Sequence, residues 1–404
     1  MRLRPDGGAP AAIDRRLFVA LPVAIVAVQL VFGGVDLLLA AALDQVEPGA
    51  AVTTYGWITG IASLCALLLY PLAGAASDRT PARFRRRTVW VMVGAAASTI
   101  GLLALGQARL VPVMGVSYVV AFASLPVMLV ALYASIPDRV APTRRGAIGA
   151  LVGAATIVGG VAGNVLAARF ADRIEIGVAV FAAVLVAGAA VFGVFGGEGR
   201  GTAAPAPSAT TTPVTVAAGR ADFVWFSIGR FALFLGYAAV TGLAYYVLRD
   251  HIGQANPANG VAVFAVVTGV ATLAASLVAG VWSDRVKRRK PFVAAASAVL
   301  GLGLLAPIAS PTFAAFLVAA AIIGVGFGAY LAVGTALGTL VLPSAESRGR
   351  DLGVIGLANA SAQAVAPIVG SYIATALGYP VLFIAAATAC LVAALAVLPI
   401  RSVR

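Results

Sequence analysis

Charged residues are scarce in this chain of 404 residues. Asp, Glu, Lys and Arg together make up 11% of it, whereas 61% is hydrophobic. A water-soluble domain of this length carries more charge and cannot bury so much apolar surface. The composition therefore excludes an ordinary soluble fold and predicts a protein embedded in a lipid bilayer.

Residues for catalysis and metal binding are also few. His251 is the only histidine, and the two cysteines, Cys65 and Cys390, lie far apart inside apolar runs. One histidine and two distant cysteines do not supply the ligands of a clustered zinc site, and a lone histidine does not indicate a Ser-His-Asp hydrolase. The Gly-x-x-x-x-Gly-Lys-Ser/Thr phosphate-binding pattern is also missing. We expect no enzymatic activity, no ATP-driven motor, no metal and no cofactor. Both cysteines are interpreted as buried thiols.

Long apolar runs recur along the chain, beginning at Leu17. About 20 apolar residues are enough for a helix to cross a hydrocarbon core roughly 30 Å thick. The first run, Leu17 to Leu43, exceeds the apolar core of a signal peptide, so we expect it to be a retained helix. The sequence predicts an all-α integral membrane protein with twelve transmembrane helices, over residues 17–43, 52–76, 88–107, 110–136, 146–168, 176–195, 223–248, 259–282, 291–309, 311–341, 353–377 and 380–399.

The net charge of +13 is distributed unevenly between the two sides of the predicted membrane. The N-terminus, the even-numbered connections and the C-terminal tail hold 23 Lys and Arg residues, whereas the odd-numbered connections hold only Arg109, Arg169, Arg173 and Arg249. Short loops rich in Lys and Arg stay cytoplasmic. We therefore expect a multi-pass protein of the cell (inner) membrane, monomeric, in contact with lipids, and with both termini cytoplasmic. A nucleic-acid partner is not expected, because such proteins gather their cations on one face of a soluble fold.

An internal repeat divides the chain into halves. Gly74-Ala-Ala-Ser-Asp-Arg79 is answered by Gly280-Val-Trp-Ser-Asp-Arg285 at an offset of 206 residues, and the same offset relates Pro137 to Pro343. A constant offset across several helices predicts two six-helix bundles related by pseudo-symmetry.

The predicted boundaries between the halves follow from a change in composition. Residues 196–222 are rich in Gly, Ala, Pro, Ser and Thr, which is typical of a flexible linker. We expect an N-terminal bundle over 1–195, a cytoplasmic linker over 196–222 and a C-terminal bundle over 223–404.

The pattern Gly74-x-x-Ser-Asp-Arg-Thr80, followed by Arg83 and Arg85-Arg86-Arg87, resembles the loop between helices 2 and 3 of the major facilitator superfamily. The SDRT-x-x-R-x-RRR form, the IPDRVAP stretch and the GVGFGAYLAV stretch resemble one subgroup, the glycoside-pentoside-hexuronide and sucrose-proton symporters. This resemblance implies uptake of a sugar or glycoside by alternating access, coupled to protons. The solute path is expected to lie between the two bundles.

Two departures keep an alternative open. The tenth predicted helix has no acidic residue near Gly334 or Thr339, where relatives in the symporter subgroup often carry one. The fifth has several glycines but lacks the proline of the drug-exporter signature. Export of a drug or secondary metabolite is therefore the second hypothesis, and a membrane receptor or scaffold is a rival outside transport.

The resemblance implies a cytoplasmic gate formed by the duplicated motif. Asp78 and Asp284 would accept hydrogen bonds at the start of a neighbouring helix and so lock the two halves together. Gly74 and Gly280 would permit close helix approach. The arginines assigned to this gate are Arg79, Arg285, Arg139, Arg144 and Arg350. The alternative is that these charges set topology alone, as we expect of the runs Arg85 to Arg87 and Lys287 to Lys290, which also suit anionic lipids.

Asp36 is the only acidic residue deep inside a predicted helix. An intramembrane carboxylate is costly and is a functional hypothesis by default. Gln29, Gly33 and Asp36 share one helical face, which we expect to line the solute path. We predict that Asp36 carries the coupling proton; the alternative is a solvated residue near the outer interface.

Arg230 is the only cation deep inside a predicted helix. The repeat offset places it 12 residues from the depth of Asp36, which is about 18 Å along the membrane normal. A direct ion pair is therefore not expected. Arg230 is a candidate for binding an anionic or hydroxyl-rich solute or for closing the inner path. The alternative is that its side chain extends along the helix so that the charge reaches the cytoplasmic interface.

Aromatic and amide side chains complete the predicted solute site. Aromatic rings can stack on a solute and amides can hydrogen-bond to it, although Tyr and Trp near helix ends are often interfacial anchors. Together with Gln29 and Arg230, the candidates are Tyr55, Trp57, Tyr237, Tyr245, Asn359 and Gln363.

Overall fold

A computed structural model describes residues 15–80, 86–196, 220–286, 288–341 and 348–400. Most of the predicted linker, 196–222, lies outside these residues, as do Arg83, Arg85 and Lys287. Within the described residues, twelve helices are long and apolar enough to cross a membrane, which confirms the predicted fold class.

These helices are α1 (Arg15–Val46), α2 (Ala51–Arg79), α3 (Arg86–Gln107), α4 (Val111–Arg139), α5 (Arg145–Arg169), α6 (Ile174–Phe195), α7 (Arg220–Thr241), α9 (Pro257–Val286), α10 (Arg289–Ala309), α11 (Phe313–Leu340), α12 (Arg348–Ala376) and α13 (Tyr379–Ala396). Three short elements join them: η2 (Pro142–Arg144), α8 (Ala244–Tyr246) and η3 (Val247–His251).

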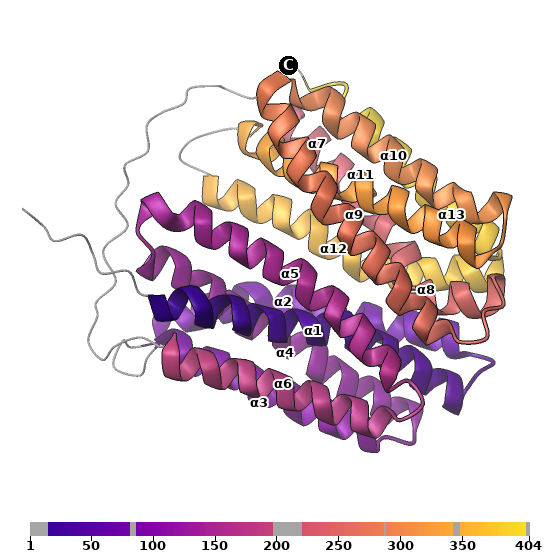
Figure 1. Ribbon diagram of the computed structural model, residues 1–404, viewed down its shortest axis with the longest axis horizontal. Helices are drawn as coiled ribbons and strands as arrows, with labels where there is room; N and C mark the ends of the chain where they lie inside the picture. Colours follow the sequence, from indigo (N-terminus) through magenta and orange to yellow (C-terminus); the bar gives the residue numbers. More distant parts are fainter. Residues whose placement is uncertain (1–14, 81–85, 197–219, 287, 342–347, 401–404) are drawn as a thin grey trace, which may run out of the picture.

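The helices form two bundles with matching internal contacts (Figure 1). In the N-terminal bundle α1 packs on α5, α3 on α4 and α2 on α4; in the C-terminal bundle α7 packs on α12, α10 on α11 and α9 on α11. The principal contacts between bundles are α2 with α12 and α5 with α9.

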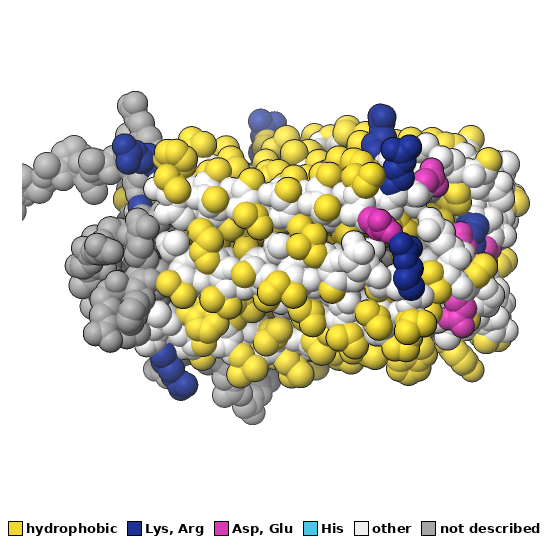
Figure 2. All heavy atoms as spheres, turned by 90° about the horizontal axis from the view of Figure 1, so that it is seen from below, with side chains coloured by type: hydrophobic (Ala, Val, Ile, Leu, Met, Phe, Trp, Pro, Cys, Tyr) yellow, Lys and Arg dark blue, Asp and Glu magenta, His cyan; other side chains and the backbone are white. Residues whose placement is uncertain are grey.

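The two ends of the bundle differ in charge. We call the end where α1, α3, α5, α7, α10 and α12 begin the basic end, and the end where the other long helices begin the acidic end. Figure 2 shows hydrophobic side chains over the middle of one face, with Asp and Glu gathered toward one end. A belt of this kind is what a bilayer requires of a protein surface.

The seventh span is not one continuous helix. The prediction of a helix over 223–248 is wrong, because α7 ends at Thr241 and the chain turns through Gly242 and Leu243 before α8 and the π-helical η3. The backbone N–H of Leu243 bonds to the carbonyl of Val240, three residues back, whereas that of Ile252 bonds to Val247, five residues back. A glycine weakens a helix at such a point. The break turns the residues after 243 toward the N-terminal bundle.

Glycine allows α1 and α5 to pack backbone to backbone. A Cβ added to Gly163 would lie 2.1 Å from the carbonyl oxygen of Leu30, and one added to Gly33 would lie 2.3 Å from the carbonyl oxygen of Gly160. Close packing through small residues is a main source of helix association in lipid.

Gly163→Ala should destabilise the protein, because the new methyl group forces α1 and α5 apart. Overpacking of this kind costs about 1–3 kcal/mol. Gly149→Ala on the same helix is the matched control, since an added Cβ there meets nothing within 4 Å. Thermal unfolding in detergent should show a lower melting temperature for Gly163→Ala only. Equal melting temperatures would contradict the close packing.

Candidate functional site

Two cavities lie between the bundles at different depths. The central cavity, about 530 Å³, is bordered by the acidic-end halves of α1, α5 and α9 and by the end of α7. The basic-end cavity, about 710 Å³, lies between α2, α4 and the basic-end half of α12. Phe32 of α1 lines both, so the two cavities are neighbours.

Asp36 lies in the wall of the central cavity, as predicted for a residue on the solute path. The hydroxyl of Tyr118 on α4 donates a hydrogen bond to its Oδ1. Tyr118 is fully buried and stacks on Phe122, with ring centroids 5.5 Å apart, and Phe122 meets Phe32 edge to face at 4.9 Å. The carboxylate is thus fixed by a tyrosine of its own bundle while it faces the cavity. There it is accessible to a proton or a solute.

Three predicted aromatic residues also line the central cavity: Tyr55, Tyr237 and Tyr245. The ring of Tyr237 stacks on Phe327, with centroids 4.0 Å apart and planes within 1° of parallel. Tyr55 is held edge to face against Tyr246 at 5.4 Å. These rings give the cavity rigid aromatic walls.

Asn359 and Gln363 line the basic-end cavity. Arg230 reaches the same place from α7, where its Nε donates to the Oδ1 of Asn359 at 2.7 Å. The structure therefore brings Arg230 to Asn359 and Gln363, two amides that the sequence predicted as a pair on one helix. It keeps Arg230 away from Asp36, which lines the other cavity.

Three predicted solute residues, Arg230, Gln29 and Trp57, are not among the residues lining either cavity. Arg230 adjoins the basic-end cavity through its bond to Asn359. Gln29 packs beside Gly159, where an added Cβ would lie 2.8 Å from the Cβ of Gln29. The side chain of Trp57 is 54% exposed on the outer surface. Its position suits a lipid-facing anchor, the alternative considered for it.

Arg87 organises the basic end of the N-terminal bundle. Its side chain is only 7% exposed; Nη1 donates to Asp78 Oδ1 and to Ser77 Oγ, each at 2.9 Å, and Nε donates to Asp138 Oδ2 at 2.9 Å. The basic run Arg85 to Arg87 was interpreted as a topology signal and a lipid contact. That interpretation missed the contacts of Arg87 with Asp78 and Asp138. Asp78 thus meets the first turn of a neighbouring helix, α3, through the guanidinium of Arg87, and this contact lies within the N-terminal bundle.

Of the other gate residues, those that the structure describes at this end are exposed or half-buried. An added Cβ at Gly74 or Gly280 would make only ordinary contacts, at 3.7 and 3.9 Å, so the expected close approach at these glycines is wrong for this conformation. Arg79, Arg144 and Arg285 are exposed, and Arg139 donates to the carbonyl of Gly196 in its own bundle. The side chains of Asp284 and Arg350 lie outside the described residues.

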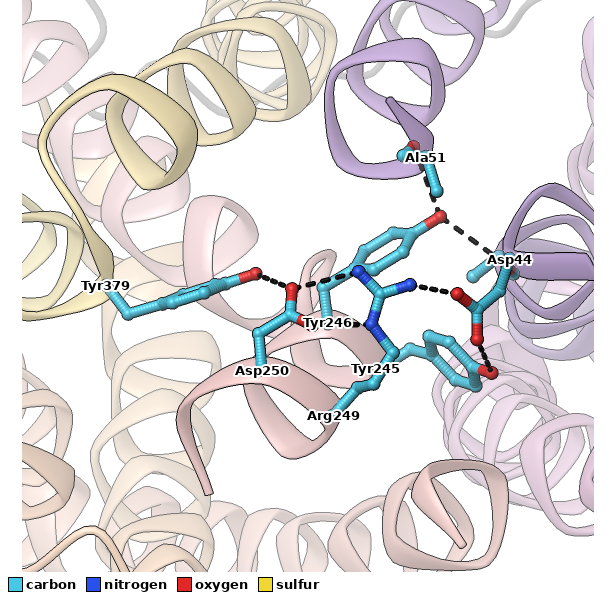
Figure 3. A network of polar contacts seen from close by, with 8 residues as sticks. Asp44, Ala51, Tyr245, Tyr246, Arg249, Asp250 and Tyr379 are labelled. Atoms are coloured by element: carbon cyan, nitrogen blue, oxygen red, sulfur yellow. Dashed lines mark hydrogen bonds and ion pairs between the residues drawn. The ribbon is translucent and has the colours of Figure 1, made fainter. Parts of the chain in front are cut away.

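A polar network closes the acidic end (Figure 3). Arg249 of η3 pairs with Asp44 of α1 and, through its Nε at 2.5 Å, with Asp250. The hydroxyl of Tyr379 donates to Asp250 at 2.6 Å, and that of Tyr245 donates to Asp44 at 3.2 Å. One arginine thus joins carboxylates from both bundles.

Neighbouring contacts make this closure tight. The hydroxyl of Tyr246 is within 3.2 Å of the carbonyl of Ala51 and 3.4 Å of that of Ala40. An added Cβ at Gly56 of α2 would lie 1.9 Å from the Oγ of Ser371 on α12. Burial, and then the Asp44 carboxylate, raise the pKa of the Tyr245 hydroxyl well above its ordinary value, so Tyr245 remains a donor at physiological pH.

The sequence matches the family description "Major Facilitator Superfamily" over residues 17–253 and 226–404. The chain belongs to this superfamily. The match extends over both bundles and fits the twelve spans and the paired internal contacts described above. No curated protein matches the chain.

Solved transporter structures share the fold of this superfamily member. Two structures of a POT family transporter, one in complex with a thioalcohol-conjugated peptide and one with 5-aminolevulinic acid, have TM-scores of 0.75 and 0.73 at 14% identity, covering 94% of both chains. A bacterial homologue of the human lysosomal transporter Spinster, inward-facing and occupied, has a TM-score of 0.71 at 14% identity over 95% of both chains. At these identities the likeness concerns the fold, and none of these structures supports the sugar-symporter subgroup.

Asp44→Asn should weaken the closure of the acidic end, because Arg249 then loses its carboxylate partner in the other bundle. A cysteine introduced at Thr268, which lines the central cavity, should react faster with an impermeant thiol reagent added from the acidic end. The background would carry Ser at positions 65 and 390, the two native cysteines.

Glu175→Gln is the matched control, since Glu175 pairs with Arg109 at the same end but inside the N-terminal bundle. We expect at least a several-fold increase in labelling for Asp44→Asn and none for the control. Unchanged labelling in Asp44→Asn would show that the ion pair does not hold this end closed.

Proposed function

We propose that this protein is a proton-coupled secondary transporter that moves a small solute across the cell (inner) membrane by alternating access. The observation that carries the proposal is the Asp36 carboxylate, which faces a cavity between two bundles and is held by Tyr118. A single carboxylate among uncharged lining side chains is suited to take up and release one proton per cycle. The superfamily membership and the transporter folds support the class of function.

The proposed orientation places the basic end in the cytoplasm, in keeping with the distribution of Lys and Arg. The acidic end, closed by Arg249, then faces outward, and the basic-end cavity faces the cytoplasm. In the alternate state the Asp44 contact would break and the two bundles would close over the basic end.

Asp36→Asn should abolish uphill accumulation and its dependence on the proton gradient, because the amide cannot exchange a proton. Exchange of labelled for unlabelled solute in proteoliposomes without a gradient should persist, since that reaction needs no net proton movement. Glu175→Gln, which removes a carboxylate far from the cavities, should leave both unchanged. Gradient-driven accumulation by Asp36→Asn at the wild-type level would refute the coupling role.

For the solute, sugar or glycoside uptake is the proposal that follows from the sequence resemblance. The second candidate is export of a drug or secondary metabolite, and it is favoured by the cavity walls. The central cavity is lined largely by apolar and aromatic side chains, among them Phe32, Tyr237, Phe264 and Phe327. Such walls suit an amphipathic solute better than a sugar that needs many hydrogen bonds.

Direction of transport separates the two candidates. Cells expressing the protein should accumulate labelled glucosides or pentosides if uptake is correct, and the Asp36→Asn variant should not. If export is correct, expression should raise resistance to some amphipathic compounds without any sugar accumulation. Both assays use the same cells, so a positive result in one identifies the direction.

A further inference from the structure

Arg230 is a buried cation whose partners are all uncharged. Its side chain lies within the seventh span and the residue is 9% exposed. Nε donates to the amide oxygen of Asn359 at 2.7 Å, the guanidinium lies 5.5 Å from the centroid of the Phe234 ring, and Tyr330 lies beside it. Among the described residues, none contributes a carboxylate to an ion pair with Arg230.

Two other arginines that are buried or half-buried have carboxylate partners. Arg87 pairs with Asp78 and Asp138, and Arg249 pairs with Asp44 and Asp250. A cation inside the membrane without an anion nearby is costly. Arg230 therefore holds a charge that the rest of the described chain leaves uncompensated.

The position of Arg230 connects this charge to a cavity. Asn359, its hydrogen-bond partner, lines the basic-end cavity, and Gln363 lies one helical turn further along the same wall. A guanidinium has five N–H donors in a planar fork that matches a carboxylate in two parallel hydrogen bonds. The bond to Asn359 uses only the Nε donor.

We propose that Arg230, with Asn359 and Gln363, is a subsite for the carboxylate group of a solute that enters the basic-end cavity. The inference rests on the proposed transport function and deepens it, because it narrows the solute to an organic acid or an acidic sugar. The opposite charge of Asp36, in the neighbouring cavity, is then left for the proton.

Ligand binding can be measured without transport, on the purified full-length protein in detergent. The probes are acetate and benzoate, with acetamide and benzamide as neutral counterparts, at ionic strength matched by sodium chloride. At about tenfold excess over the dissociation constant, the carboxylates should raise the melting temperature by about 2 °C. The neutral compounds should raise it by less than half as much.

Arg230→Gln should abolish the shift caused by the carboxylates. Arg109→Gln is the matched control, because it removes the same charge from an exposed pair with Glu175 at the acidic end and should leave the shift intact. A carboxylate-specific shift that persists in Arg230→Gln would overturn the proposal, as would equal shifts by acids and amides in the wild-type protein.

Asn359→Asp provides a second, independent variant that does not depend on Arg230→Gln folding. The new carboxylate takes the place of the amide already 2.7 Å from Arg230 and supplies the missing anion from within the chain. The ligand-free protein should melt at a higher temperature, and acetate and benzoate should no longer raise it. A lower melting temperature with an intact response to carboxylates would contradict the subsite.

These measurements use no gradient, so they are separate from the test of coupling at Asp36. Loss of accumulation in Asp36→Asn together with no carboxylate response would remove the subsite and leave the transporter. A carboxylate response with normal accumulation in Asp36→Asn would remove the coupling role and leave the subsite.

Discussion

A charge inside a bilayer needs a partner from the protein, because lipid cannot solvate it. The pair between Arg249 and Asp44 meets this need at the acidic end and joins the two bundles while doing so. The pair lies at the end opposite the basic-end cavity between α2 and α12. Because Asp250 lies next to Arg249 in the same turn, opening would separate Arg249 only from Asp44. In the proposed cycle the arginine would keep a counter-charge in both states, which would lower the cost of the movement.

The internal repeat explains why this network could have been found from the sequence. The offset of 206 residues relates Asp44 to Asp250, so the two carboxylates occupy equivalent positions in the two bundles. Symmetry brings both to the same end, and Arg249 stands between them. The repeat was recognised through the motif at Gly74 and Gly280, and its acidic-end counterpart was overlooked because a pair of single aspartates 206 residues apart has no motif around it.

Long-range apolar patterning predicted the twelve spans, and the cost of an intramembrane charge predicted Asp36 and Arg230 as residues facing the solute path. Contacts between helices were not predictable in the same way. Tyr118 is 82 residues from Asp36 in the sequence. A tyrosine in an apolar run gives no sign of such a hydrogen bond until the packing of α1 on α4 is known. Arg87 looked like one more residue of a basic loop, and only the fold shows it buried between two aspartates. The helix break after Thr241 was missed because Gly242 is one of many glycines within the predicted helices.

The separation of Asp36 from Arg230 limits how coupling can work. The two residues line or adjoin different cavities, so a small solute at the proposed Arg230 subsite would lie in the cavity next to that of Asp36. Communication must then pass through the helices: α1 carries both Asp36 and Asp44, and the seventh span carries Arg230 and leads through the break at Gly242 to Arg249. Protonation of Asp36 and occupation of Arg230 would therefore each bias the same element, the Asp44–Arg249 contact, from opposite bundles. Two ligands that bias one two-state contact are coupled without touching each other.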